Sequence, residues 1–141
     1  EISACLVGSE MCIRDRDVTS QLSRTDEEIQ NLVGHSATVV RPPYGSFNDT
    51  VAGIAARPLI MWSVDTLDWE TQNADSTVQN VMDNAQDGAI ILMHDIFKES
   101  VDAAEVFIPQ LIQEGYQLVT VSELAAAKGI TLEAGTSYGA F

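Results

Sequence analysis

The sequence predicts an α/β fold built on a parallel sheet, or part of a (β/α) barrel. Short apolar runs alternate with helix-like segments between Thr25 and Ala127, and the connections between them are short. This alternation is typical of parallel β/α units. Only four strands are expected, which is too few to close a barrel.

Capping residues and chain breakers predict where the helices begin and end. Thr25 and Glu28 have the spacing of a capping box, so a helix is expected to start at Thr25 and to stop before Gly34. Asn48 and Ser76 are expected to cap the next two helices. The expected helices are 25–33, 48–57, 76–85, 103–114 (with a kink at Pro109) and 122–127.

The strands are predicted from apolar and β-branched runs that end in polar residues. The run 89–93 follows an Asp87-Gly88 turn and ends at His94, and a short apolar run of this kind is typical of a buried strand. The other strands are expected at 38–41, 59–64 and 116–121. Residues 128–141 have no strong period and are expected to form a tail.

Composition excludes some kinds of partner. The 141 residues carry a net charge of −14, with 21 acidic and 7 basic side chains. Such a surface repels nucleic acid and weakly favours a neutral or cationic ligand. No apolar run approaches the roughly 20 residues that cross a bilayer. Both cysteines lie before residue 17, so a disulfide scaffold or a cysteine-based zinc site is not expected in the rest of the chain.

The first sixteen residues differ from the rest of the chain. They show no helical or strand period, and residues 9–16 look like translated sequencing-adapter sequence. We therefore expect residues 1–16 to be a non-native leader. Residues 17–127 are then expected to form a partial domain.

Polar side chains follow three of the expected strands. Arg41 to Tyr44 follow the first, Asp65 to Trp69 the second, and His94 and Asp95 the third. Because parallel β/α units place all carboxyl ends of their strands on one rim, these side chains are expected to converge. The apolar strands need none of them for packing, so the coincidence favours a functional site.

Each of these residue types suits a chemical role. Asp68 could accept the Nδ1–H of His94, which would orient the imidazole for general-acid catalysis. Arg41 could hold a carboxylate through two hydrogen bonds. The prolines before Tyr44 restrict the backbone, so that the Tyr44 amide could face a developing oxyanion. Trp69 offers a flat surface on which a sugar ring could stack.

These segments resemble motifs of a known family. Arg41-Pro-Pro-Tyr44-Gly45, Asp65-Thr-Leu-Asp68-Trp69 and Leu92-Met-His94-Asp95 resemble, in order and spacing, the third, fourth and fifth motifs of the polysaccharide deacetylases, the NodB-homology carbohydrate esterases. The resemblance covers about residues 17–124. It implies the C-terminal part of a distorted (β/α) barrel, truncated at the N-terminus.

The resemblance implies a function and a role for each residue. Family members remove N-acetyl groups from chitin-type sugars or peptidoglycan, or O-acetyl groups from xylan, with a divalent metal such as zinc. His94 would be the catalytic acid, Asp68 its orienting partner and Arg41 the tether of the catalytic base. The Tyr44 amide would be an oxyanion donor, and Trp69 and Leu92 would wall the acetyl pocket. The parent protein is expected outside the cell or at the cell wall.

The departure from the family pattern concerns the metal. The first motif, with the base and a metal-binding aspartate, and the second, with two metal-binding histidines, are absent from the sequence. No metal ligand is therefore assigned, the 141-residue chain is expected to bind no catalytic metal, and it is expected to be inactive. His35 lies outside the motif positions and is expected at the surface.

Two alternatives differ in class. A non-catalytic carbohydrate-binding relative would keep the residues after the strands and lack the metal. A flavodoxin-like signalling domain would need an acidic pocket near the start and a lysine directly after a late strand, which neither Lys98 nor Lys128 provides. Asp65 and Asp95 could each shape the site or merely cap a loop.

We expect the chain alone to be poorly stable, because a partial barrel leaves a sheet edge and apolar helix faces uncovered. Thermal unfolding followed by calorimetry should give a broad transition of low enthalpy. A cooperative transition of a monomer would contradict this expectation.

Overall fold

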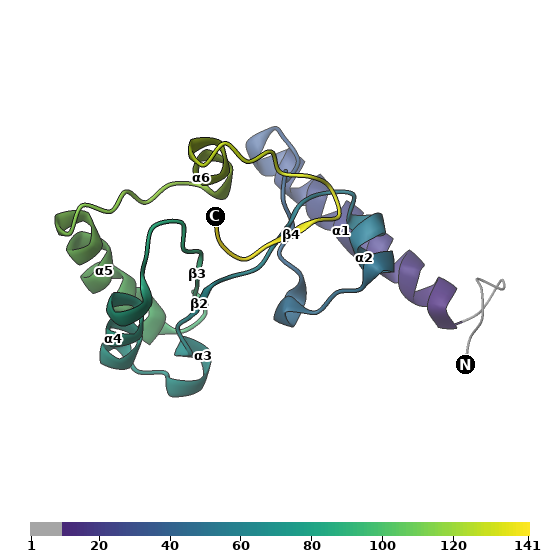
Figure 1. The fold of residues 1–141 in the computed structure, drawn as a ribbon. Coiled ribbons are helices and arrows are strands. Elements are labelled where there is room, and N and C mark those ends of the chain that lie inside the picture. The colour runs from purple at the N-terminus through teal and green to yellow at the C-terminus, as the bar shows by residue number, and fades with distance from the viewer. Residues whose placement is uncertain (1–9) are drawn as a thin grey trace. The chain divides into compact units, whose positions relative to one another are not determined.

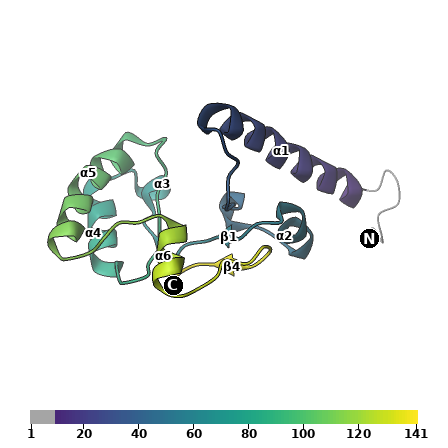
Figure 2. The same ribbon diagram turned by 90° about the horizontal axis from the view of Figure 1, so that it is seen from above.

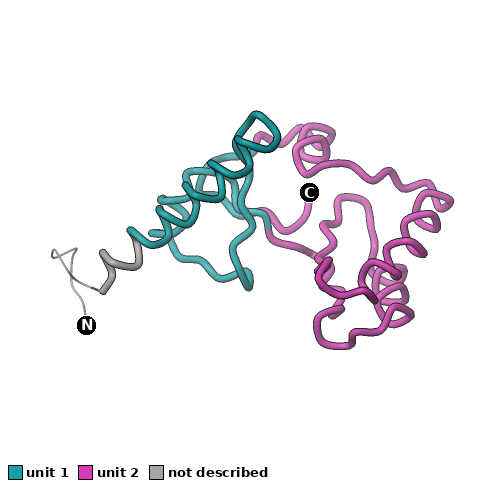
Figure 3. Tube along the Cα trace, turned by 180° about the vertical axis from the view of Figure 1, so that it is seen from behind, with its two compact units in different colours: residues 1–60, 132–137 teal, residues 61–131, 138–141 magenta. Residues whose placement is uncertain are grey.

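The computed structural model describes residues 10–141 and divides into two compact units (Figure 3). Unit 1 comprises residues 10–60 and 132–137 of the described chain, and unit 2 comprises residues 61–131 and 138–141. Part of the expected leader, residues 1–9, lies outside the described residues. Figures 1 and 2 label the elements.

Unit 1 contains two helices, a 3₁₀ turn and a short strand. These elements are α1 (Glu10–Val33), η1 (Pro43–Gly45), α2 (Asp49–Ala55) and β1 (Leu59–Ile60). Ala52, Ala55 and Leu59 form its buried core, against which Leu22 and Val40 pack. A strand was expected at 38–41. In the described structure this region forms a single parallel bridge, between Val40 and Leu59, and no longer strand.

The capping box expected at Thr25 is wrong. Thr25 lies inside α1, and its hydroxyl donates to the Gln21 carbonyl at 2.9 Å. Because the helix already continues upstream, no first-turn amide near Thr25 needs a cap. Instead Asp26 forms a bidentate ion pair with Arg57, whose guanidinium also donates to the Ala37 carbonyl at 3.1 Å.

The cap expected at Asn48 is confirmed. Its side chain accepts from the Val51 amide at 2.9 Å and begins α2. The helix ends at Ala55, and the C-cap residue Ala56 adopts a left-handed conformation with φ 48°. This conformation is uncommon for a residue that carries a Cβ.

Unit 2 packs helices beside a parallel strand pair. Its elements are β2 (Val64–Asp65), α3 (Asp68–Thr71), α4 (Ala74–Asn84), β3 (Ile91–Leu92), α5 (Lys98–Gln113) and α6 (Val121–Ala127). α4 lies alongside α5 (Figures 1 and 2), and their shared core is Val81, Ala103, Phe107 and Leu111. Three apolar residues of α5, Val101, Val106 and Ile112, remain about half exposed.

Three helix starts in unit 2 differ from the expected ones. Asn73, not Ser76, caps α4 by accepting from the Ser76 amide at 2.9 Å. α5 begins five residues before Ala103, at Lys98. Thr120, not Ser122, is the N-cap of α6, which begins at Val121, and it forms a complete capping box with Glu123. For α4 and α6 a polar residue upstream of the apolar pattern caps the helix, whereas α5 follows Phe97, which makes no side-chain cap. In all three cases the apolar period alone placed the start too late.

The strand pattern also differs from the expectation. The run 59–64 divides between β1 and β2, which join different partners. Residues 116–120 form no strand in the described structure, and Leu118 and Val119 stay exposed. An apolar β-branched run becomes a strand only where a neighbouring strand accepts its hydrogen bonds.

The expected tail is partly ordered by pairing. β4 (Ser137–Tyr138) pairs with β1, and Ala140 forms an antiparallel bridge with Ala89. The Tyr138 and Phe141 rings stack with centroids 5.6 Å apart. The backbone of these C-terminal residues thus pairs with neighbouring extended segments. A pattern of apolar residues in the sequence does not reveal such pairing.

The α4–α5 core provides a matched pair of stability tests. Leu111 is 3% exposed and its neighbour Ile112 is 57% exposed. Leu111→Ala should lower the free energy of unfolding by about 2–5 kcal/mol, because it leaves a cavity in the core. Ile112→Ala should change it by less than about 0.5 kcal/mol. Urea unfolding followed by circular dichroism measures both, and equal losses would contradict the packing.

Candidate active site

The parallel pair β2 and β3 brings two distant loops to one edge of unit 2. Val64 pairs with Ile91, and Asp65 pairs with Leu92. Because the two strands run in the same direction, the chain after Asp65 and the chain after Leu92 leave at the same end. This confirms, for these two strands, that their polar loops lie together.

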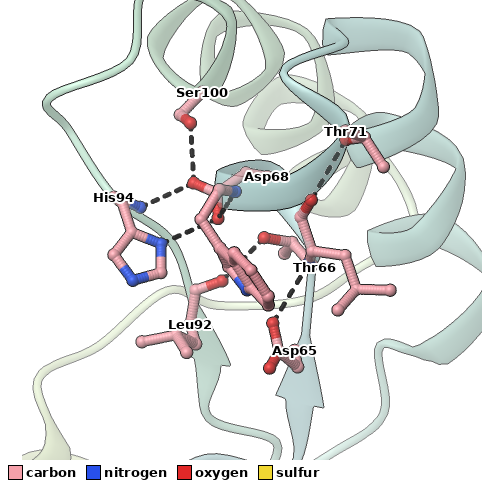
Figure 4. Close-up of polar contacts among 9 residues, drawn as sticks. Asp65, Thr66, Asp68, Thr71, Leu92, His94 and Ser100 are labelled. Carbon is pink, nitrogen blue, oxygen red and sulfur yellow. Dashed lines mark hydrogen bonds and ion pairs between the residues drawn. The ribbon is translucent and has the colours of Figure 1, made fainter. Parts of the chain in front are cut away.

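The loop after β2 is shaped by its own side chains. Thr66, 1% exposed, donates from Oγ1 to the Leu92 carbonyl at 2.8 Å, which ties the loop to β3 (Figure 4). Asp65 accepts from the Leu67 amide at 3.1 Å, so Asp65 caps the loop. Leu67 adopts φ 56°, a left-handed conformation that turns the chain into α3. Asp68 is thereby placed in the first turn of α3.

Asp68 is buried with a donor set that fills both carboxylate oxygens. Its Oδ1 accepts from the Trp69 amide at 2.9 Å and from His94 Nδ1 at 2.8 Å. Its Oδ2 accepts from the His94 amide at 2.6 Å and from Ser100 Oγ at 2.6 Å. Asp68 is 1% exposed, and Figure 4 shows it between His94 and Ser100.

The environment lowers the pKa of Asp68 below its ordinary value. Burial acts in the opposite direction and raises the pKa, because it disfavours the charged form. The hydrogen bonds from the Ser100 hydroxyl, the His94 ring and the His94 amide together outweigh burial. Asp68 is therefore ionised at neutral pH.

His94 has one ring nitrogen held and the other open. The side chain is 36% exposed, and Nδ1 faces the Asp68 carboxylate. An ionised carboxylate accepts hydrogen bonds only, so Nδ1 carries a proton. Nε2 lies on the far side of the ring from Asp68 and makes no hydrogen bond within the described part of the chain (Figure 4). The Phe97 ring stands edge-on to the imidazole at 6.5 Å.

This arrangement can transfer a proton at Nε2. Imidazole commonly serves as a proton donor or acceptor in proteins, and a carboxylate on Nδ1 fixes which ring nitrogen faces the ligand side. Trp69, in the first turn of α3, is 49% exposed, whereas Leu92 is buried. Both lie within a few residues of the Asp68–His94 pair in sequence.

Arg41 and Tyr44 lie in unit 1. Arg41 donates from Nε to the Ile60 carbonyl at 3.3 Å. Tyr44 lies inside η1 with φ 57°, and its side chain is 98% exposed. Asp68 and His94 belong to unit 2, so the convergence of Arg41 and Tyr44 with them on one rim remains a prediction.

Ser100 was not predicted from the sequence. The expected helix began at Ala103, which left Ser100 in a loop without an assigned role. It belongs instead to the first turn of α5, where it is 2% exposed. A buried serine six residues after a candidate catalytic histidine would have been recognisable only if the helix start had been placed correctly.

The described residues do not fit a metal site. Among the side chains that the structure describes, residues 16–141, no three histidine, cysteine, aspartate or glutamate side chains group closely enough to hold a metal ion. Nδ1 of His94 is hydrogen-bonded to Asp68, and His35 is exposed in unit 1 beside Ser36.

None of the described helices is long and apolar enough to cross a membrane.

Asp68→Asn tests the ionised carboxylate. The amide nitrogen cannot accept a hydrogen bond, so one backbone or ring donor loses its partner. This loss should lower the free energy of unfolding by about 1–3 kcal/mol at pH 7. Because folding lowers the pKa of Asp68, its stabilisation is present above the unfolded value of about 3.9 and is lost as the pH falls through the folded value. Urea unfolding from pH 7 to pH 3 should show the difference between wild type and variant shrinking below about pH 4. A difference that does not depend on pH would contradict an ionised Asp68.

Comparison with known proteins identifies the family. A family model for polysaccharide deacetylase matches residues 11–58. The chain is 41% identical over 113 residues to the peptidoglycan-N-acetylmuramic acid deacetylase PdaC of Bacillus subtilis, covering 80% of this chain and 24% of the relative. It is 38% identical over 123 residues to the peptidoglycan-N-acetylglucosamine deacetylase PgdA of Listeria monocytogenes, covering 87% and 26%. The chain thus spans about a quarter of these curated relatives.

Solved structures agree with the fold. The T48 deacetylase with substrate is 35% identical with a TM-score of 0.83, covering 88% of this chain and 61% of that one. A family 4 acetyl xylan esterase from Clostridium thermocellum, in complex with a cobalt ion, has a TM-score of 0.83 at 24% identity, covering 99% and 68%. A CE4 family pseudoenzyme from Bacillus anthracis, BA3943, is 34% identical with a TM-score of 0.71, covering 78% and 40%.

These matches confirm the predicted α/β fold as part of a deacetylase domain. The family is metal-dependent, and its members are hydrolases that act on acetyl groups of carbohydrates. Sequence and structure agree that this chain belongs to the polysaccharide deacetylase family, of whose members it matches a part.

Proposed function

We propose that the protein to which this chain belongs is a metal-dependent deacetylase that removes N-acetyl, or O-acetyl, groups from a glycan. The observation that carries this proposal is the Asp68–His94 pair, with Nδ1 held at 2.8 Å and Nε2 open. The described side chains, residues 16–141, include no group of three potential metal ligands, so the steps below involve only residues of this chain. The metal and the catalytic base would come from the parts of the domain that this chain does not match.

His94 is the proposed general acid. When the tetrahedral intermediate collapses, the carbon–nitrogen bond breaks and the leaving amine takes the proton from Nε2. The Asp68 carboxylate keeps the Nδ1 proton in place and stabilises the imidazolium before the transfer. Asp68 itself stays ionised, consistent with its lowered pKa.

Arg41 and Tyr44 have proposed roles in the other half of the reaction. Arg41 would hold the carboxylate that serves as the base through charge-assisted hydrogen bonds. The Tyr44 amide would donate to the developing oxyanion. The left-handed backbone at Tyr44 supports a special role for this turn, since such a conformation costs on the order of 1–3 kcal/mol and is concentrated at functional sites.

The proposed substrate is an acetylated polysaccharide such as peptidoglycan or a chitin-type oligosaccharide. PdaC and PgdA carry the names of peptidoglycan deacetylases, which favours a cell-wall glycan and a place outside the cell or at the cell wall. Trp69 and Leu92 are the proposed walls of the acetyl pocket. The net charge of −14 suits a neutral glycan better than an anionic polymer.

A non-catalytic carbohydrate-binding protein of the same fold is the second candidate. It is supported by the likeness to BA3943, which is called a CE4 family pseudoenzyme. The upstream sequence of the gene would separate the candidates. An aspartate pair after the first strand and a His-x-x-x-His pattern would support the enzyme, and their loss would support the binding protein.

The first activity test uses the chain alone. With added zinc or cobalt, the 141-residue chain should release no acetate from N-acetylglucosamine oligosaccharides or peptidoglycan, because it lacks the first two motifs. Turnover above background would contradict this.

The second activity test supplies the missing motifs. In a chimera, the segment of PdaC with the first two motifs precedes residues 17–141 of this chain. Deacetylation is expected, and His94→Ala should lower kcat by about 10²–10⁴, the usual contribution of a general acid. His35→Ala, at an exposed position in unit 1, should leave kcat unchanged. Equal activity of the His94 variant and the unmutated chimera would contradict the role of His94.

A further inference from the structure

Ser100 carries a buried hydroxyl to which the proposed reaction assigns no role. It is the third residue of α5, it is 2% exposed, and its Oγ donates to Asp68 Oδ2 at 2.6 Å. We propose that Ser100 is a positioning residue, which fixes the Asp68 carboxylate so that Oδ1 keeps the proton on His94 Nδ1. The catalytic role of Ser100 rests on the proposed function, whereas its effect on the tautomer of His94 does not.

The argument starts from how the donors are shared. Oδ1 receives the Trp69 amide and the His94 ring, and Oδ2 receives the His94 amide and Ser100. Two donors on each oxygen hold the carboxylate plane against rotation about Cβ–Cγ. Without the Ser100 hydroxyl, Oδ2 keeps one donor, at a position too buried for bulk water to replace the other.

Ser100 is also the one donor of this set that comes from α5. The other donors belong to Trp69 of α3 and to His94 after β3. The hydroxyl therefore links α5 to a carboxylate 32 residues earlier in the chain. A serine in the first turn of a helix commonly bonds to nearby backbone, so this long-range partner indicates a specific use.

The charged groups near His94 do not offer a substitute for this link. Asp68 is the charged side chain that contacts the imidazole within the described structure. Lys98 and Asp102 of α5 pair with each other at the exposed surface, and Asp95 is exposed. The tautomer of His94 thus depends on how firmly Asp68 is held.

The test measures the tautomer of His94 directly. Nitrogen-15 NMR of the 141-residue chain, labelled at histidine, distinguishes the Nδ1–H from the Nε2–H form. Wild type should favour Nδ1–H. Ser100→Ala should lower the ratio of Nδ1–H to Nε2–H by roughly three- to tenfold, and Ser100→Thr, which keeps the hydroxyl, should restore it.

The chain offers matched controls. Ser76 is also the third residue of its helix, α4, but it is exposed, so Ser76→Ala should leave the His94 ratio unchanged. His35 lies in unit 1, and its signals should not change in any variant. If Ser100→Ala does not fold, Ser100→Cys provides a second variant, because a thiol is a weak donor of similar size. Its ratio of Nδ1–H to Nε2–H at His94 should lie between that of wild type and that expected for Ser100→Ala.

A wild-type ratio in Ser100→Ala or Ser100→Cys would overturn the proposal, as would a ratio in Ser100→Thr as low as that expected for the alanine variant. The measurement needs no turnover. Absence of deacetylation in the PdaC chimera would therefore count against the proposed function and would leave the role of Ser100 toward His94 intact.

Discussion

The buried charge of Asp68 is the constraint on which the rest of unit 2 depends. A carboxylate that is 1% exposed is tolerated only if hydrogen-bond donors replace the water that it has lost. Here the donors come from the first turn of α3, from the chain after β3 and from the first turn of α5. One carboxylate therefore sets the mutual positions of three elements, and a donor lost from any of them would leave buried charge uncompensated.

The same constraint produces the chemistry of the site. Holding Nδ1 of His94 leaves Nε2 as the position where a proton can be exchanged with a ligand. The Asp26–Arg57 pair of unit 1 provides a contrast, because it joins a carboxylate to a guanidinium, each about one-fifth exposed, and contains no imidazole. Its role is to join the end of α2 to α1, whereas Asp68 orients the imidazole of His94.

Local signals were reliable where the chain decides its structure locally. The Asn48 cap, the turn before β3 and the α/β alternation were predicted from short segments. Predictions were wrong where a strand-like run has no partner strand, and where a helix starts further upstream than the local pattern indicates. The run 116–121 has strand-like residues, yet its first five residues, 116–120, pair with no strand in the described structure and Val121 begins α6. Thr25 has the spacing of a capping box, but α1 had already started upstream.

The sequence by itself determined the family motifs, and from these the expectation that Asp68 orients His94, because motif order and residue chemistry are linear properties of the chain. Tertiary structure alone decided that Asp68 is buried and ionised, that Thr66 ties β2 to β3, and that Ser100 completes the carboxylate's donor set. These facts depend on how α3, β3 and α5 pack together. The burial of Asp68 and the hydrogen bonds Thr66–Leu92 and Ser100–Asp68, between residues 26 and 32 positions apart, are consequences of that packing, which no local pattern encodes.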